Sequence, residues 1–341
     1  RAIVLTAERS GIRILGIRNA FSGLIHKQTI ELGSAMVDPL LQQGGTVLGS
    51  SNRDNPFKYL MTTDGKHQPV DVSETVIDNF KEMGLDGLVA IGGDGTLQIT
   101  YKLTKKGLPA ICVPKTIDND LLATDVTFGF DTAVGVATEA IDRIRTTAES
   151  HGRLMVVEVM GRNAGWIALF SGLAGGADVI LLPEIPFSIG AIANAINEDR
   201  IAGKNFSVIV VAEGAHEVGG EVVVKKIVAD PTEPRRLGGV GTLVGQLLED
   251  QTGIETRVTI LGHVQRGGTP STYDRNLSTR FGVHAARNAI EGNFGHLVAL
   301  RNGEVKLVPL AEAAKGQRLV SPDSDFIRVA RSVGISFGDG I

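Results

Sequence analysis

The glycine-rich turn Gly-Gly-Asp-Gly-Thr at 92–96 is the sharpest chemical signal in the chain. It follows an apolar run at 87–91 and precedes a segment, 97–106, that we expect to be helical. Backbone amides of such a turn can approach phosphate oxygens, and the helix N-terminus adds partial positive charge. Because an acidic residue would repel bare phosphate, Asp94 suggests a direct or water-mediated ligand of a Mg²⁺ that accompanies the phosphates. A tight strand-to-helix turn capped by Asp94 stays an equal alternative for this motif alone.

A second polar segment, Pro-Lys-Thr-Ile-Asp-Asn-Asp at 114–120, follows the next apolar run. Both segments leave the carboxyl ends of neighbouring strands, where open α/β sheets bind ligands. One carboxylate, of Asp118 or Asp120, can take the proton of a substrate hydroxyl as its oxygen attacks a phosphoryl group, and the other can orient metal-bound water or a neighbouring group. For this loop alone an Asx turn would be the first choice. Because the two carboxylates are expected to face the glycine-rich turn, the two segments together favour phosphoryl transfer.

Four arginines stand at the ends of expected strands. Arg162 lies in Met-Gly-Arg-Asn-Ala-Gly-Trp and Arg266 in Leu-Gly-His-Val-Gln-Arg-Gly-Gly, each loop following an apolar run. Arg153 and Arg257 lie near the starts of the same two runs. The planar fork of arginine binds phosphate through two parallel hydrogen bonds. A single surface arginine is usually just solvated, but four beside anion-suited loops point to a substrate that itself carries phosphate.

Glu213 and His263 are further candidates for contacts with a substrate. Glu213, which follows the apolar run at 208–212, could accept hydrogen bonds from sugar hydroxyls, and His263 could do the same or pack as a structural histidine. Cys112 lies in an apolar run and is expected to be inert, and Trp166 is expected to serve packing. The sequence has no His-Glu-x-x-His motif and no Cys/His cluster, so zinc-site and catalytic-triad interpretations are weak.

Strands and helices that alternate along the chain must position these loops. The apolar runs are continuous rather than alternating, which indicates parallel sheets covered on both faces. Helical periodicity at 72–83 and 134–148 separates them, so we predict α/β units. The length exceeds the roughly 250–300 residues at which one core stops growing, so two lobes are expected. Hairpin strands are expected at 220–229 and at 297–309 around Asn302-Gly303. The predicted strands are 14–17, 87–91, 110–113, 154–159, 179–182 and 208–212.

Composition limits the function classes. Of 341 residues, 34 are Lys or Arg and 38 are Asp or Glu, a net charge of −4, and 43% are hydrophobic, unlike a disordered chain. A single Cys excludes an intrachain disulfide and favours a reducing cytoplasm. No apolar run reaches the roughly 18 residues of a membrane span, and no Lys/Arg stripe suits nucleic acid. We therefore expect a cytoplasmic protein with neither a membrane nor a nucleic acid as partner.

Together these segments strongly resemble the 6-phosphofructokinase family across nearly the whole chain. The resemblance implies an α/β fold of two Rossmann-like lobes with mostly parallel sheets sandwiched by helices, in which the chain crosses between lobes more than once. Residues 1–130 plus 266–310 would form the phosphoryl-donor lobe, and 131–265 plus 311–341 the sugar-phosphate lobe. The matching runs are SSNRDNPF (51–58), GGDGT (92–96), PKTIDND (114–120), SHGR (150–153), MGRNAG (160–165), PEIPF (183–187), VAEG (211–214), ETR (255–257) and GHVQRGGTPS (262–271).

The resemblance also implies an activity and its residues. The enzyme would transfer the γ-phosphoryl group of ATP to the 1-hydroxyl of fructose 6-phosphate in glycolysis, giving fructose 1,6-bisphosphate. Asp118 would be the general base with Thr116 and Asp120 beside it, Arg162 would stabilise charge on the transferring group, and Asp94 would bind Mg²⁺. The rest of the donor-nucleotide site would be Arg53, Asp54, Gly95, Thr96 and Leu97. The substrate contacts would be Thr116, Ile117, Asp118, Met160, Gly161, Arg162, Glu213, His263, Val264, Gln265 and Arg266.

Arg153 and Arg257 resemble the arginines that, in this family, reach into a neighbouring subunit's substrate site. The resemblance therefore implies a homo-oligomer, either a dimer or a tetramer. A monomer would not complete its own site.

The donor depends on two positions. Family members that use ATP resemble this chain in having Gly at position 95, whereas pyrophosphate users typically have Asp there together with Lys at the position of Lys115. An acidic side chain at 95 would occupy and repel the α-phosphate region, and a lysine near phosphates attracts either donor. The pair, which resembles actinobacterial-type members, favours ATP and keeps pyrophosphate as the alternative.

The start of the chain departs from the family pattern. Family members begin with a strand, a GGD-x-PGLN-like loop and a helix, and Arg1 matches an early residue of that helix. About twenty residues, including a central strand and backbone donors to phosphate, would be absent, so a catalytically impaired subunit is a further alternative. A relative of NAD or lipid kinases, which also use GGDGT, is disfavoured because the loops at 114–120 and 262–268 would lack a role.

Overall fold

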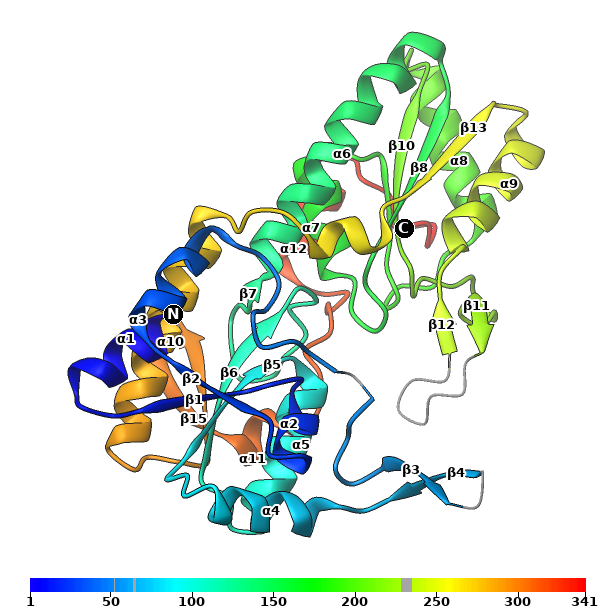
Figure 1. Ribbon diagram of the computed structural model, residues 1–341. Helices are drawn as coiled ribbons and strands as arrows, with labels where there is room; N and C mark the ends of the chain where they lie inside the picture. The colour runs from blue at the N-terminus through cyan, green and yellow to red at the C-terminus, as the bar shows by residue number, and fades with distance from the viewer. Residues whose placement is uncertain (52, 64–65, 228–234) are drawn as a thin grey trace.

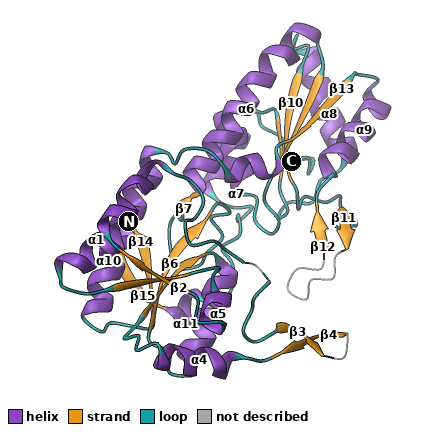
Figure 2. Cartoon of the chain, viewed as in Figure 1, coloured by secondary structure: helices purple, strands orange, loops and turns teal. Residues whose placement is uncertain are grey.

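The structure, a computed structural model, describes residues 1–51, 53–63, 66–227 and 235–341, which form two α/β lobes (Figure 1). The main sheet of each lobe lies between helices (Figure 2). The prediction of two lobes with mostly parallel, helix-covered sheets is confirmed. Among the helices in these ranges, none combines the length and apolar character needed to cross a membrane.

The lower lobe in Figure 1 contains a sheet with strand order β15-β14-β6-β5, and β7 also pairs with β6. Its pairs are parallel except for the β14–β15 hairpin. Residues 110–113 of β6 are at most 2% exposed because both faces of the strand are covered. Cys112 packs toward Leu97, whereas Ile111 and Val113 pack with Phe281 on the other face. The strands are β5 (Leu88–Gly92), β6 (Ala110–Thr116), β7 (Phe128–Gly129), β14 (His296–Arg301) and β15 (Glu304–Pro309), and the covering helices are α5 (Asp94–Thr104) and α10 (Thr272–Ile290).

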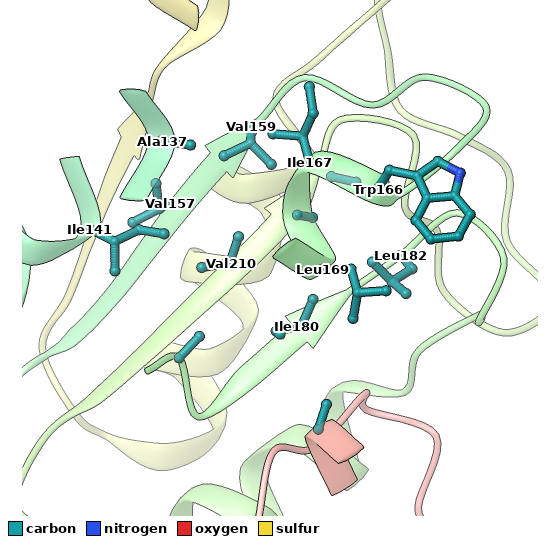
Figure 3. Packing of buried hydrophobic residues seen from close by; sticks show 14 of the residues in the cluster. Ala137, Ile141, Val157, Val159, Trp166, Ile167, Leu169, Ile180, Leu182 and Val210 are labelled. Atoms are coloured by element: carbon teal, nitrogen blue, oxygen red, sulfur yellow. The ribbon is translucent and has the colours of Figure 1, made fainter. Parts of the chain in front are cut away.

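The upper lobe has a fully parallel sheet with strand order β13-β8-β10-β9. Figure 3 shows one face of it, where side chains of α6 and α7 pack on the sheet, among them Ala137, Ile141, Ile167 and Leu169. Helices α8 and α9 cover the opposite face. The strands are β8 (Leu154–Val159), β9 (Val179–Leu181), β10 (Ser207–Ala212) and β13 (Thr256–Ile260), and the helices are α6 (Phe130–His151), α7 (Trp166–Ala174), α8 (Ile189–Ile201), α9 (Val240–Thr252) and α12 (Asp325–Ser332).

Both predicted hairpins lie on antiparallel strand pairs. Asn302 and Gly303 have positive φ angles of 52° and 81°, as a two-residue hairpin turn requires, and they join β14 to β15. In the segment predicted at 220–229, β11 (Val224–Ile227) pairs with β12 (Arg235–Leu237). Residues 228 and 229 of that prediction lie outside the described residues.

One predicted strand has a different partner from the one expected. β1 (Ile14–Ile17) was expected in a covered parallel sheet, but it pairs antiparallel with β2 (Thr29–Leu32) in a two-stranded sheet. Three of its four residues are only partly buried, because no second layer covers both faces. The chain begins with the helix α1 (Ala2–Arg9), which packs on α10. The remaining elements are α2 (Phe21–Ile25), α3 (Ser34–Val37), η1 (Asp38–Gln42), β3 (Tyr59–Thr63), β4 (Lys66–Val70), α4 (Ser73–Glu82), η2 (Gly262–Arg266) and α11 (Leu310–Ala313).

The lobes meet where α6 and α10 begin. The Asp274 carboxylate of α10 accepts a hydrogen bond from the Thr132 amide of α6 at 2.8 Å. The Ser271 hydroxyl, which caps α10, donates to the Asp131 carboxylate. Each helix thus supplies side chains to the N-terminus of the other, where backbone amides lack partners within their own helix.

Candidate functional site

The glycine-rich turn begins at the last residue of β5, and Asp94 is the first residue of α5. A methyl group at Gly92 would lie 2.3 Å from Thr96 Oγ1, so close packing requires glycine there. A methyl group at Gly95 would meet no atom of the described residues within 4 Å, and the residue is exposed. Packing therefore explains Gly92 but not Gly95. Thr96 is partly buried and Leu97 is buried.

The second loop leaves β6 at Thr116, whose hydroxyl organises it. The Asp118 amide donates to Thr116 Oγ1 at 3.2 Å, and Thr116 Oγ1 lies 3.3 Å from Asp118 Oδ2. The Asn119 side chain accepts from the Thr127 amide at 3.0 Å, and the Thr127 hydroxyl donates to the Thr116 carbonyl at 2.8 Å. Asp118 is partly exposed, so its carboxylate is held in place yet accessible.

The carboxylates of the two loops interact electrostatically. Burial, followed by the negative charges of Asp118 and Asp94, raises the pKa of Asp120 to about 6. Burial also raises the pKa of Glu213, at the end of β10, and Asp118 adds to that effect. The lower-lobe loops and the upper-lobe residue Glu213 therefore share one electrostatic environment.

Two cations stand among these acids. Burial of its charge and the proximity of Arg266 lower the pKa of Lys115, and Asp118 opposes this shift. The Lys115 side chain is nonetheless solvent-accessible, so it lines the site. Arg266 also interacts with Glu213, which places η2 beside the end of β10.

Buried hydrogen bonds connect the upper-lobe loops. Gln265 is 1% exposed, accepts from the Met160 amide at 3.3 Å and donates to the Gly262 carbonyl at 3.1 Å. The Gly214 amide donates to the Gly161 carbonyl at 3.1 Å. The side chains of Ile117, Met160 and Gln265 thus point into protein, whereas His263, Val264 and Arg266 are exposed and Arg162 is partly exposed.

Arg153 and Arg257 do not join this group. Arg153 precedes β8, and Arg257 is the second residue of β13, where it pairs in register with Met155. Met160 follows the other end of β8, and six residues at about 3.3 Å each separate the two ends by roughly 20 Å. Both guanidinium groups instead pair with the Glu255 carboxylate.

Arg53 and Asp54 lie on the loop that leads into β3, and the Arg53 amide donates to Ser51 Oγ at 3.2 Å. Arg53 is exposed and Asp54 partly buried. Their place beside a donor remains a prediction from the resemblance.

Sequence reasoning missed two amide side chains at the site. Gln98 donates to Asp94 Oδ1 at 3.2 Å, and Gln317 donates to Asp120 Oδ2 at 3.0 Å. Gln98 stands one helical turn after Asp94, a spacing that could have drawn attention to it. Gln317 is 197 positions from Asp120 in the sequence, so no local pattern predicts this hydrogen bond. Trp166 and Cys112 are buried as expected, and burial raises the pKa of the Cys112 thiol to about 12.

The acidic groups suit Mg²⁺ in one respect. The described part of the chain holds no group of three or more His, Cys, Asp or Glu side chains arranged to bind a metal by themselves. Mg²⁺ commonly uses one or two carboxylates together with water and substrate phosphates, which Asp94 can satisfy. A divalent cation would also offset the negative charges of Asp118 and Asp94, which add to the effect of burial in raising the pKa of Asp120.

The fold and this site define a two-lobed α/β protein whose strand ends gather acids and cations at the junction between lobes. The sequence profile described as phosphofructokinase matches residues 1–289, and the chain belongs to the phosphofructokinase family. The expectation of a phosphotransferase is confirmed at that level.

Relatives with both donor types match nearly the whole chain. An ATP-dependent 6-phosphofructokinase 2 of Clostridium perfringens is 50% identical, over 99% of this chain and 93% of its own length. An ATP-dependent 6-phosphofructokinase of Chloroflexus aurantiacus is 49% identical, over 99% of this chain and 93% of its own length. A pyrophosphate--fructose 6-phosphate 1-phosphotransferase of Amycolatopsis methanolica is also 49% identical, over 95% of this chain and 92% of its own length. Overall identity therefore does not separate ATP from pyrophosphate.

Solved structures share the fold. Phosphofructokinase of Pichia pastoris in the T-state has a TM-score of 0.77 at 27% identity, over 99% of this chain, which spans 35% of the yeast chain. A pyrophosphate-dependent phosphofructokinase of Nitrosospira multiformis has a TM-score of 0.79 at 22% identity, over 98% of this chain and 87% of its own. The second likeness concerns the fold alone.

The raised pKa of Asp120 predicts a pH-dependent effect on stability. Because the folded-state pKa, about 6, lies above the ordinary 3.8, the stabilisation from protonated Asp120 is present below pH 3.8 and is lost as pH rises through 6. Asp120→Asn, permanently neutral, should therefore raise the free energy of unfolding at pH 7 by about 1–3 kcal/mol and change it little near pH 4. Urea denaturation in EDTA without substrate measures the free energy of unfolding of both proteins at each pH.

Asp142→Asn, an exposed change on α6, is the matched control and should shift stability by less than about 0.5 kcal/mol at either pH. An Asp120→Asn protein that is no more stable than wild type at pH 7, or whose gain does not depend on pH, would contradict the electrostatic account.

Proposed function

We propose that this protein is an ATP-dependent 6-phosphofructokinase that forms fructose 1,6-bisphosphate from fructose 6-phosphate. The observation that carries the proposal is the convergence of Asp94 and Asp118 with Lys115 and Arg266 where the strand ends of the two lobes meet. A phosphoryl donor and a phosphorylated acceptor both need such cations and backbone amides, and the reacting hydroxyl needs a base. Relatives named for this activity support it.

In the proposed reaction the 1-hydroxyl oxygen of fructose 6-phosphate attacks the γ-phosphorus of ATP. The new oxygen–phosphorus bond forms as the bond to ADP breaks, and Asp118 takes the hydroxyl proton. Thr116 holds the Asp118 carboxylate through its hydroxyl. Asp120 keeps a second charge beside the base, and Arg162 stabilises negative charge on the transferring group.

The substrate and donor contacts follow the same assignment. Exposed His263, Val264 and Arg266 with Glu213 would meet the sugar phosphate through side chains. Ile117, Met160, Gly161 and Gln265 would contribute backbone groups, because three of these side chains are buried. Asp94 would hold Mg²⁺, which supplies charge neutralisation at the phosphates when bound. The remaining donor contacts would be Arg53, Asp54, Gly95, Thr96 and Leu97.

Gly95 supports ATP over pyrophosphate. Since no packing requires glycine there, the open space beside the N-terminus of α5 is available to a bulkier donor. Pyrophosphate is the second candidate, because Lys115 stands at the site and a pyrophosphate-dependent relative is 49% identical.

The remaining assignments concern assembly and location. Residues 1–130 plus 266–310 would be the donor lobe and 131–265 plus 311–341 the sugar-phosphate lobe of a cytoplasmic enzyme. The protein would be a homo-oligomer in which Arg153 and Arg257 serve a neighbouring copy. Their distance of roughly 20 Å from the chain's own upper-lobe loops supports this, because neither side chain can span it.

Removing the proposed base tests the function directly. Asp118→Asn should lower kcat about a thousandfold, since general-base catalysis of this kind contributes about 10²–10⁴. The measurement is production of fructose 1,6-bisphosphate in a coupled assay with ATP. Asp86→Asn, exposed at the opposite end of β5, is the control and should keep wild-type kcat. Wild-type protein that phosphorylates no fructose 6-phosphate, or an Asp118→Asn protein of undiminished kcat, would overturn the assignment.

Position 95 tests the donor. Wild type should turn over with ATP and far more slowly with pyrophosphate, and Gly95→Asp should lower kcat/KM for ATP about 100-fold, because a carboxylate would face the nucleotide phosphates. Gly95→Ala fits the same open space without charge and should retain most activity with ATP. Turnover with pyrophosphate alone would replace the leading proposal by the second candidate.

Co-expression tests the shared site. Asp118→Ala and Arg257→Ala subunits should each be nearly inactive alone, whereas hybrids regain about a quarter of wild-type activity, since half the dimers are mixed and each carries one intact site. Activity of the mixture no greater than that of the separate variants, with hybrid dimers verified by tagged purification, would mean that Arg257 does not act across subunits.

A further inference from the structure

A short segment near the C-terminus contacts both lobes at the edge of the proposed site. We call residues 314–320 the C-terminal strap. It follows α11 in the lower lobe and leads to α12 in the upper lobe. At its first residue, the Ala314 carbonyl accepts from Gln98 Nε2 at 3.1 Å, and the same nitrogen donates to Asp94 Oδ1 at 3.2 Å. The strap thus supports the side chain that holds Asp94.

Gln317, in the middle of the strap, uses both ends of its amide. Its Nε2 donates to Asp120 Oδ2 at 3.0 Å, and its Oε1 accepts from Asn163 Nδ2 at 3.1 Å. The reversed amide would set nitrogen against nitrogen and oxygen against carboxylate, so the two partners define one orientation. The backbone also joins the loops, because Leu121 and Gln317 form a β-bridge and the Arg318 amide donates to the Asp120 carbonyl at 2.8 Å.

The far end of the strap is attached to the upper lobe. Trp166 Nε1 donates to the Arg318 carbonyl at 2.8 Å, and the Arg318 guanidinium stacks 4.4 Å above the Trp166 ring. The Val320 amide donates to Glu184, whose carboxylate also accepts from the Gly165 amide at the start of α7. The strap therefore connects the loop of Asp120 to the loop of Arg162 and Asn163.

We propose that Gln317 is a positioning residue, which holds the Asp120 carboxylate beside Asp118 and couples it to the Arg162 loop through Asn163. This rests on the proposed function, because the roles of Asp118 and Arg162 belong to it. A neutral amide suits the task. Asp120 already faces the negative charges of Asp118 and Asp94, and Gln317 satisfies one of its oxygens without adding charge.

Three substitutions at one position separate the two hydrogen bonds. Gln317→Met keeps length and shape but neither bond, and kcat should fall about tenfold, as loss of a hydrogen bond to a charged group implies. Gln317→Lys keeps a donor to Asp120 and should recover most of the wild-type kcat. Gln317→Glu keeps only the acceptor for Asn163 and repels Asp120, so its kcat should be lower than that of Gln317→Met. KM for ATP should stay within about twofold of wild type in all three. Lys315→Gln, exposed on the same strap, is the control and should match wild type.

Hydrogen–deuterium exchange supplies a readout that does not need turnover. Gln317→Met should exchange faster than wild type at 116–121 and at 160–165, and Lys315→Gln should not. Unchanged exchange in these loops, or a wild-type kcat in Gln317→Met despite faster exchange or a lower Tm, would overturn the positioning role. If wild type phosphorylates no fructose 6-phosphate, the proposed function is wrong, while the exchange comparison still decides whether Gln317 couples the loops.

Discussion

Burial of the Asp120 carboxylate beside other carboxylates is the constraint on which the junction between the lobes depends. Asp120 is 8% exposed and faces Asp118 and Asp94, so its pKa rises to about 6. Such an arrangement costs stability at neutral pH, because charge is held where water cannot solvate it fully. Phosphoryl transfer needs several carboxylates close together, because the reacting hydroxyl requires an ionised base and a divalent cation requires carboxylate oxygens. Local instability is therefore built into the site.

The compensation comes from polar and positively charged groups both near the acids in sequence and far from them. Gln98 and Gln317 donate to Asp94 and Asp120, and Lys115 and Arg266 bring positive charge. These groups belong to both lobes, so the electrostatic balance holds only while the lobes keep their relative position. The reciprocal contacts between the starts of α6 and α10, and the C-terminal strap, hold that position. Stability between the lobes and chemistry between the loops thus share one set of polar contacts.

The sequence predicted what depends on local pattern. Continuous apolar runs gave β8 at its observed bounds, and the glycine-rich turn predicted the strand–turn–helix order at Asp94. Partners far apart in sequence could not be predicted this way. Periodicity gives strand 14–17 but not its antiparallel partner, and nothing near Gln317 indicates Asp120, 197 positions away. Nor could a motif tell that the Gln265 side chain points inward to bind two loops together.

Neighbouring glycines of one motif have different physical reasons to be glycine. At Gly92 a methyl group would lie 2.3 Å from Thr96 Oγ1, so the strand-to-helix turn cannot close with a larger residue. At Gly95 the surroundings leave room, the residue is helical, and alanine would favour the helix more. The requirements of folding therefore explain the glycine at position 92 but would favour another residue at position 95. The proposed function gives Gly95 a role that folding does not impose, because an acidic side chain there would face the phosphates of the donor.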